Sequence, residues 1–146
     1  MLFYFNLGFY IGISNLYIIQ LYELPIFLDS LRSPELGGLA ILIAFILIFL
    51  SVGLFRKNTE DPNPTTQSNI LITTGIYKYI RNPMYLALVL LQIGLGISLS
   101  FLHISFMSIF TAITLHYFII KREETYLKNS FGADYESYKS KSRRWI

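Results

Sequence analysis

The chain has 146 residues, of which 53% are hydrophobic and only 14% are charged, with a formal net charge of +3. Soluble domains carry about a quarter charged residues, so this composition favours a membrane protein over an unusually apolar globule. The absence of cysteine excludes disulfides, thiol nucleophiles and thiolate metal sites. The two histidines, His103 and His116, lie far apart and without neighbouring carboxylates, and we expect no metal site.

The first apolar segment, 1–22, carries no charged residue, although Asn6, Asn15, Gln20 and several tyrosines make it less apolar than the later ones. It lacks the basic start and the small-residue cleavage site of a signal peptide. We therefore predict a first membrane helix over 2–22.

Two further charge-free runs follow. The run 37–55 has the length of one crossing, because a helix spans the hydrocarbon core with about 20 apolar residues. The run 83–120 is nearly twice as long, and its middle, SLSFLHIS, gathers serines and a histidine that suit a tight turn. We predict one helix over 36–55 and a hairpin of two helices, the second ending near Lys121. The expected fold is all-α, an integral membrane protein with about four transmembrane helices.

The basic residues gather on one side of the predicted membrane. All lysines and arginines except Arg32 fall within 56–82 or after Ile120, which a chain with four crossings places on the same face. The positive-inside rule makes that face cytoplasmic, so we expect a multi-pass cell-membrane protein with both termini in the cytoplasm. The positive charge then reflects topology and anionic lipid head groups, and we expect no nucleic-acid partner.

This interpretation divides the chain into two parts. Residues 1–55 hold the first two helices, and residues 56–146 hold the proposed cofactor-binding region. The second part contains a polar loop (RKNTEDPNPTTQSN), a half-apolar segment too short to cross (ILITTGIYKYI), the hairpin and a basic tail. Several aromatic side chains punctuate the tail, which is typical of a segment lying at the membrane interface. They are Tyr126, Phe131, Tyr135, Tyr138 and Trp145.

Asn82 and Pro83 mark the start of the hairpin's first helix. Asn is favoured at the N-cap and Pro at the first helical position, and a helix start leaves backbone N–H groups that attract a carboxylate. Tyr77, Arg81 and Tyr85 surround this position at four-residue spacing. Tyrosines are also typical of the interfacial aromatic belt, so the spacing alone leaves both a belt and a ligand site open.

Glu123 and Glu124 fall at the other end of the hairpin. With a turn near residue 102, Asn82 and Glu123 are almost equally far from the turn along the antiparallel hairpin. We therefore expect them to lie side by side at the same membrane depth. A solvated, charged helix end is the ordinary meaning of such acids. The last turn is, however, the unfavourable end of the helix dipole for a carboxylate, so we expect Arg81 or a bound cation to compensate them.

The chemistry of this corner suits S-adenosylmethionine. The ribose hydroxyls and the ammonium of that molecule seek acceptors, its carboxylate seeks N–H groups or arginine, and its sulfonium tolerates aromatic faces. A carboxylate, a helix start and tyrosines supply all three.

The stretches LITTGIYKYIRNPMY and REETYLKNSFGADYESYKSKSRRWI, separated by a helical hairpin, resemble the isoprenylcysteine carboxyl methyltransferase and phospholipid methyltransferase superfamily. The family pattern is Gly-x-Tyr, Arg-His-Pro-x-Tyr, Glu-Glu-x-x-Leu and Phe-Gly-x-x-Tyr, and the resemblance covers 56–146. Asn82 replaces the family's histidine. Ile119 stands where the eukaryotic isoprenylcysteine enzymes carry an arginine for the substrate carboxylate, so a prenylated cysteine is not the expected substrate.

The resemblance also implies a set of site residues. The implied cofactor contacts are Asn69, Ile70, Leu71, Ile72, Tyr77, Asn82, Pro83, Met84, Tyr85 and Glu123. Arg81 and Glu124 would support these contacts. Arg81, Tyr85 and Glu124 are the candidate catalytic residues, with Tyr85 or Glu124 as the base if the acceptor needs one.

We therefore expect a membrane-embedded S-adenosylmethionine-dependent methyltransferase that acts on a lipophilic or amphipathic acceptor by direct displacement. Two alternatives stay open. One is a non-catalytic membrane module in which the motif is only a cap and a belt. The other is a distantly related membrane reductase with a nicotinamide cofactor, whose phosphates would need more basic groups than Arg81 and Lys78 supply. The sequence leaves the acceptor atom and the oligomeric state open.

Overall fold

The computed structural model describes residues 33–58, 70–99 and 101–146, and within these ranges every regular element is helical. The elements are α2 (Pro34–Lys57), η2 (Gly75–Lys78), α3 (Pro83–Ser98), α4 (Leu102–Thr114), η3 (Leu115–Ile120) and α5 (Lys121–Lys141). The helix predicted over 2–22 and the candidate contact Asn69 lie outside the described residues. The all-α class is confirmed, while the number of crossings stays a prediction.

Helix α2 has well-defined ends. The Ser33 hydroxyl accepts a hydrogen bond from the Leu36 N–H at 3.3 Å, and a proline occupies the first turn. Arg56 and Lys57 occupy the last turn, where positive charge suits the helix dipole. These signals explain why the helix extends slightly beyond the predicted 36–55.

Two helices among the described residues are long and apolar enough to cross a membrane. They are Pro34–Lys57, with 24 residues, and the helical run His103–Lys141, with 39 residues and a kink at Gly132. Helix Pro83–Ser98 is apolar but shorter. The apolar part of the long helix ends at Ile120, and the polar part begins at Lys121.

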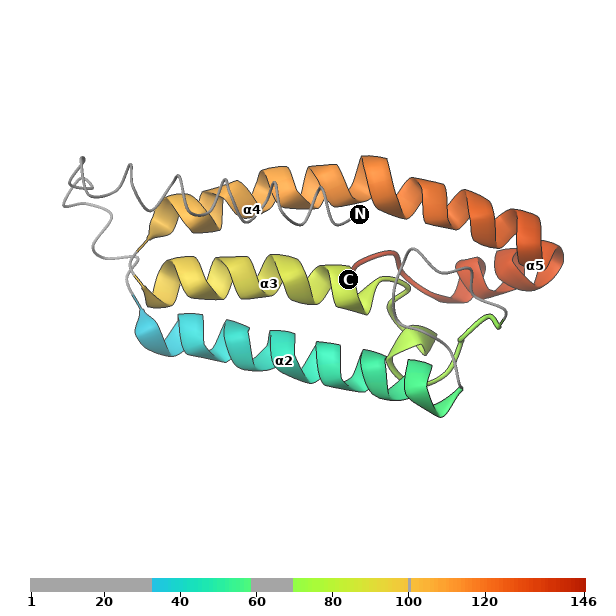
Figure 1. Ribbon diagram of the computed structural model, residues 1–146, viewed down its shortest axis with the longest axis horizontal. Coiled ribbons are helices and arrows are strands. Elements are labelled where there is room, and N and C mark those ends of the chain that lie inside the picture. Colours follow the sequence, from blue (N-terminus) through green and yellow to red (C-terminus); the bar gives the residue numbers. More distant parts are fainter. Residues whose placement is uncertain (1–32, 59–69, 100) are drawn as a thin grey trace.

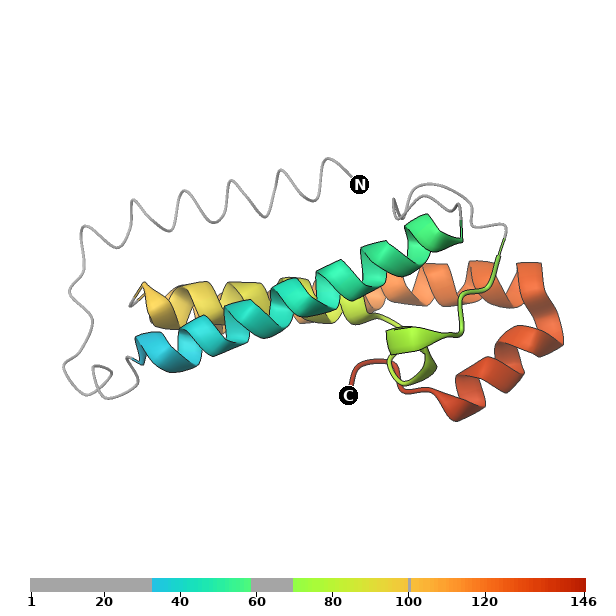
Figure 2. The same ribbon diagram turned by 90° about the horizontal axis from the view of Figure 1, so that it is seen from below.

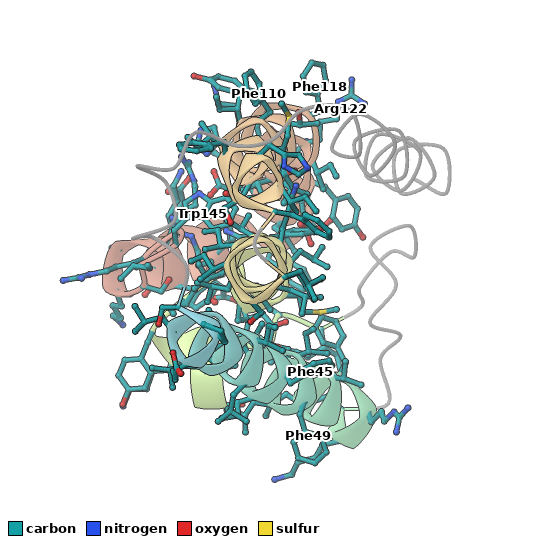
Figure 3. The ribbon with its side chains drawn as sticks, turned by 90° about the vertical axis from the view of Figure 1, so that its left-hand side faces the viewer. Phe45, Phe49, Phe110, Phe118, Arg122 and Trp145 are labelled. Atoms are coloured by element: carbon teal, nitrogen blue, oxygen red, sulfur yellow. The ribbon has the colours of Figure 1, made fainter. Side chains whose placement is uncertain are left out.

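Helix α3 lies between α2 and α4, so the three form a layer with α3 in the middle (Figure 1). The end-on view shows Phe45 and Phe49 of α2 pointing away on one side, and Phe110 and Phe118 pointing away on the other (Figure 3). Phe49 is 78% exposed. The outer faces are therefore apolar, and the tightest packing lies along α3.

Small residues bring these helices close together. A Cβ atom on Gly94 would lie 2.8 Å from the Gly37 carbonyl oxygen, and one on Gly96 would lie 2.6 Å from the Ser105 backbone nitrogen. The Ser105 hydroxyl also donates to the Ile93 carbonyl across the α3–α4 contact at 3.0 Å. Close approach at small residues with interhelical hydrogen bonds is characteristic of packing between membrane helices.

The hairpin prediction is confirmed, because α3 ends at Ser98 and α4 begins at Leu102. The prediction that the second helix ends near Lys121 is wrong. The helix continues through η3 into α5 and reaches Lys141. Nothing in the sequence after Lys121 breaks a helix until Gly132, which explains the extension.

The helix reverses direction at Gly132, whose backbone angles are φ 51° and ψ −119°. Side chains rarely tolerate such a positive φ, and glycine adopts it without steric cost. The second half of α5 consequently turns back toward the bundle, and the C-terminus comes to lie beside the start of α3 (Figure 2). There the Arg81 N–H donates to the Arg143 carbonyl and the Arg143 N–H to the Tyr79 carbonyl, both at 2.8 Å.

Candidate functional site

A hollow opens where the start of α3, the end of α2 and the two halves of α5 meet. Its cavity volume is about 60 Å³, and about 550 Å³ of empty space is present when its opening to solvent is counted. The described residues that line it are Phe55, Ile70, Leu71, Ile72, Tyr77, Arg81, Asn82, Glu123, Glu124, Leu127, Tyr135 and Tyr138. We call this space the hollow.

Glu123 lines the hollow and carries an unused acceptor. Its Oε2 atom is buried and has no hydrogen-bond partner among the described residues. Burial raises the pKa of the Glu123 carboxyl, a hydrogen bond from the Tyr85 hydroxyl lowers it, and the neighbouring Glu124 raises it further, with a net rise. A buried polar atom without a partner costs free energy, so a hydrogen-bond donor that entered the hollow would be stabilised at this oxygen.

Glu124 is, in contrast, fully engaged. Arg144 donates from Nε to Oε1 at 2.8 Å and from Nη2 to Oε2 at 2.7 Å, and Arg81 Nη2 lies 3.7 Å from Oε1. Burial works to raise the pKa of Glu124, but the Arg144 hydrogen bond and charge, with Arg81 and Lys139, outweigh burial and hold it below its usual value. The expected compensation by Arg81 is therefore present, and Arg144 supplies most of it.

Arg81 ties the end of α5 to the start of α3. Its Nη1 atom donates to the Lys139 carbonyl at 3.0 Å, to the Ser142 carbonyl, and to the Ser142 hydroxyl at 3.3 Å. The last carbonyls of a helix lack intrahelical partners, and this guanidinium supplies one. Its Nε atom is buried and has no partner among the described residues.

Asn82 occupies the N-cap position of α3 and Pro83 the first turn, as predicted, but the Asn82 side chain does not cap the helix. Its Nδ2 atom instead donates to the Arg144 carbonyl at 2.9 Å. The end of the chain after α5, which turns back onto the start of α3, takes the amide away from the first turn. The N–H groups at the start of α3 consequently receive no side-chain cap.

Tyrosines form much of the wall. Tyr77 in η2 is buried edge-on against Phe55, with ring centroids 5.8 Å apart, and burial raises the pKa of its hydroxyl well above the usual value. The Tyr138 hydroxyl donates to the Tyr77 carbonyl at 2.7 Å. Tyr135 is 1% exposed, and its hydroxyl has no hydrogen-bond partner among the described residues.

The predicted site residues divide into three groups. Those that line the hollow are Ile70, Leu71, Ile72, Tyr77, Arg81, Asn82, Glu123 and Glu124. Pro83, Met84 and Tyr85 begin α3 and do not line the hollow. Tyr85 is connected to the hollow indirectly, because its hydroxyl donates a hydrogen bond to Glu123. Asn69 lies outside the described residues. What these side chains bind stays a prediction.

Sequence reasoning missed other lining residues, namely Phe55, Leu127, Tyr135 and Tyr138, and the partner of Glu124, Arg144. The Phe-Gly-x-x-Tyr pattern contained a usable signal, because Gly132 permits the chain reversal that brings the two tyrosines back. No group of three or more metal-ligating side chains occurs within the part of the chain that the structure describes.

Comparison with known proteins places this arrangement in a family. The profile of the phospholipid methyltransferase family matches residues 34–134, which is more than half of the chain. The chain belongs to the phospholipid methyltransferase family. The resemblance inferred from the motifs is thus confirmed, and this phospholipid methyltransferase family match includes Asn82 and both glutamates but stops before Tyr138 and Arg144.

A relative extends the comparison without naming a substrate. An uncharacterized protein of Haemophilus influenzae is 42% identical over 67 residues, which make up 43% of this chain and all of that protein. No solved structure matches the chain. Membership of the phospholipid methyltransferase family indicates methyltransferase chemistry in general.

Proposed function

We propose that this protein is a membrane-embedded methyltransferase that uses S-adenosylmethionine to methylate a lipophilic or amphipathic acceptor. The family supplies the methyltransferase class. One observation carries the choice of cofactor and its location. Glu123 lines the hollow, and its buried Oε2 atom has no hydrogen-bond partner among the described residues.

The donor set of the hollow fits this cofactor. Glu123 would accept from the ribose hydroxyls or the ammonium, and the uncapped N–H groups at the start of α3 would receive the carboxylate. The faces of Tyr77 and Tyr135 would lie near the sulfonium, since aromatic faces attract cations. Ile70, Leu71 and Ile72 would line the apolar part.

When bound, S-adenosylmethionine supplies a methyl group whose bond to sulfur breaks, with the electron pair staying on sulfur, as the acceptor's lone pair forms the new bond. Aligning two reactants lowers a barrier by about 7–11 kcal/mol, so a carboxylate or thiolate acceptor needs no base. An amine or hydroxyl acceptor must lose a proton. We assign that role to the Tyr85–Glu123 pair rather than to Glu124, because Arg144 occupies both oxygens of Glu124.

The membrane placement follows from the apolar outer faces. Phe45 and Phe49 on α2 and Phe110 and Phe118 on α4 and η3 are more than half exposed, and we propose that acyl chains cover them. The hollow would then lie at the polar, cytoplasmic end of the bundle, where the positive-inside rule puts the basic residues. The acceptor would enter from the bilayer, and the substrate class would be a lipid or another amphiphile.

Cofactor binding tests this proposal directly. Wild type in detergent should bind labelled S-adenosylmethionine saturably and should not bind NADPH, which separates a methyltransferase from a reductase and from a non-catalytic module. Glu123→Gln keeps the shape and loses charge-assisted hydrogen bonds worth about 1.5–3 kcal/mol, so affinity should fall roughly ten- to a hundredfold.

The matched control is Glu136→Gln, which removes an exposed carboxylate of α5 held by Lys128 at 2.9 Å. Its affinity should equal that of wild type. Equal affinity of Glu123→Gln and wild type, or saturable binding of NADPH alone, would overturn the proposed function.

A further inference from the structure

The segment 142–145 contacts two residues that line the hollow, Asn82 and Glu124, although it lies beyond the residues that the family profile matches. Its backbone pairs with the stretch before α3 through a parallel bridge between Ile80 and Arg143. The Arg144 carbonyl accepts the Asn82 amide at 2.9 Å. We call residues 142–145 the returning tail.

Trp145 anchors the returning tail to the bundle. It packs against a core cluster that includes Leu86 and Ala87, and against a second cluster made by Tyr85, Leu115 and Ile120. The first cluster joins α3 to α2, and the second joins α3 to η3. The side chain of Trp145 is half-buried between them.

The charge contact that holds the returning tail involves both oxygens of Glu124. The side chain of Glu124 is 13% exposed and that of Arg144 is 32% exposed, so water screens this pair less than a surface pair. A two-pronged guanidinium–carboxylate contact fixes direction as well as distance. Without Arg144, the carboxylate would keep only Arg81, whose nitrogen lies 3.7 Å away.

We propose that Arg144 is a positioning residue for the hollow. By holding both oxygens of Glu124 it fixes the returning tail against the residues that line the hollow, and it leaves Glu123 as the one carboxylate among the lining residues with an unused oxygen. The ligand part of this inference rests on the proposed function. The docking of the tail does not.

The single tryptophan of the chain makes docking measurable without any ligand. In Arg144→Gln, emission from Trp145 should move to longer wavelength and become more accessible to a water-soluble quencher, because the tail separates from α3. Arg144→Lys keeps the positive charge but cannot make the two-pronged contact with Glu124. Its emission wavelength and its accessibility to the quencher should therefore lie between those of wild type and Arg144→Gln. The matched control is Arg143→Gln, whose side chain is exposed while its backbone makes the bridge, and its emission should equal that of wild type.

Cofactor titration on the same proteins tests positioning. Arg144→Gln should lose about tenfold in affinity for S-adenosylmethionine, the size expected for a disturbed hydrogen bond to a charged group. Arg144→Lys should recover part of that loss, and Arg143→Gln should bind as wild type does. Equal affinities of Arg144→Lys and Arg144→Gln for S-adenosylmethionine would overturn the proposal. An unchanged emission spectrum in Arg144→Gln would overturn it as well.

The outcomes of the two readouts are separable. A shifted emission with unchanged affinity means that the tail docks without shaping the hollow, which overturns the positioning role. If wild type binds no S-adenosylmethionine, the proposed function fails, and the Trp145 emission of Arg144→Gln alone then supports or overturns the assigned docking contact. A helical circular-dichroism spectrum equal to that of wild type shows that the variants have folded.

Discussion

Two adjacent carboxylates, Glu123 and Glu124, have opposite environments. Glu124 is neutralised by an arginine fork, which lowers its pKa, whereas Glu123 is desolvated and has one oxygen without a partner among the described residues, which accompanies a raised pKa. Environments that shift the pKa values of two neighbouring acids in opposite directions are typical of functional sites. The difference arises because neighbouring residues on a helix point about 100° apart, so the Glu124 side chain reaches Arg144 of the tail and the Glu123 side chain does not.

The pKa of Glu124 leads to a prediction in acid. Its folded-state pKa lies below the usual 4.5, so the pair's contribution to stability is complete above that value and is lost as the pH falls through the folded pKa. The melting temperature of wild type should therefore drop, and Trp145 emission should shift, as the pH falls below about 4.5.

Glu124→Gln provides the comparison, because it retains Glu123 and every other titrating group. Its melting temperature should be lower than that of wild type at neutral pH and should converge with it in acid. Parallel melting curves across the whole pH range would show that the Arg144 contact contributes nothing to stability.

Tyr135 offers a test in which stability and affinity move in opposite directions. Its buried hydroxyl has no partner among the described residues, and burial raises the pKa of Tyr135 to about 12. Removing an unsatisfied buried polar atom relieves a cost of about 1–3 kcal/mol. Tyr135→Phe should therefore melt at or above the wild-type temperature without ligand, yet bind S-adenosylmethionine several-fold more weakly.

Melting curves with and without cofactor measure both effects. Tyr79→Phe, which alters an exposed tyrosine of the same region, should change neither quantity. A loss of ligand-free stability in Tyr135→Phe would mean that the hydroxyl serves the fold instead of a ligand.

At the scale of elements, the reversal at Gly132 decides where the tail goes. A Cβ atom there would meet nothing within 4 Å, so the cost of a substitution is conformational and not steric crowding. Gly132→Ala should destabilise the protein by about 1–3 kcal/mol, the cost of holding a residue in a sparsely populated backbone region. It should also shift Trp145 emission, because the reversal brings the tail back.

Gly53→Ala is the matched control, since Gly53 lies inside α2 and a Cβ atom there also meets nothing within 4 Å. In a helix interior alanine is more stable than glycine by about 0.5–1 kcal/mol. The two substitutions should thus have opposite signs in thermal melting. A stabilising Gly132→Ala would show that the reversal is not required.

The elements themselves were largely predictable. The charge-free runs 37–55 and 83–120 indicated α2 and the hairpin. Apolar runs of such length are typical of helices that cross a bilayer, because a helix satisfies its own backbone hydrogen bonds. The meeting of Asn82 and Glu123 followed from the symmetry of an antiparallel hairpin, and both line the hollow. Local and periodic signals were sufficient for these features.

The contacts of the tail were not predictable in the same way. The sequence offers several basic residues for Glu124, and only the reversal at Gly132 selects Arg144 over Arg143 or Lys139. The same reversal removes the Asn82 amide from its expected capping role. A tail rich in bases and aromatic residues also fits a membrane interface, so its composition did not indicate where it docks.

At the scale of the whole molecule, three helices form a thin layer (Figure 1). The residues that line the hollow come from the end of α2, the start of α3 and α5, so the hollow lies at one end of this layer rather than inside a globular core. Helix α3 is the only one of the three with neighbours on both sides among the described residues. The start of α3, which carries Asn82, is therefore held by α2, by α5 and by the tail together. This explains how a small protein built as a thin layer of helices keeps a defined site at its polar end.

The position of Glu123 along its helix has a consequence for the choice of acceptor. Ile120 is the last residue of the apolar stretch, and Glu123 follows it by a rise of about 4.5 Å at 1.5 Å per residue. In the proposed membrane placement, Glu123 and the cofactor that it would hold therefore lie close to the hydrocarbon boundary, and we expect the acceptor to reach them there. Amphiphiles whose nucleophile is joined closely to the acyl region reach this depth, whereas those with a long hydrophilic spacer hold their nucleophile too far out in the water.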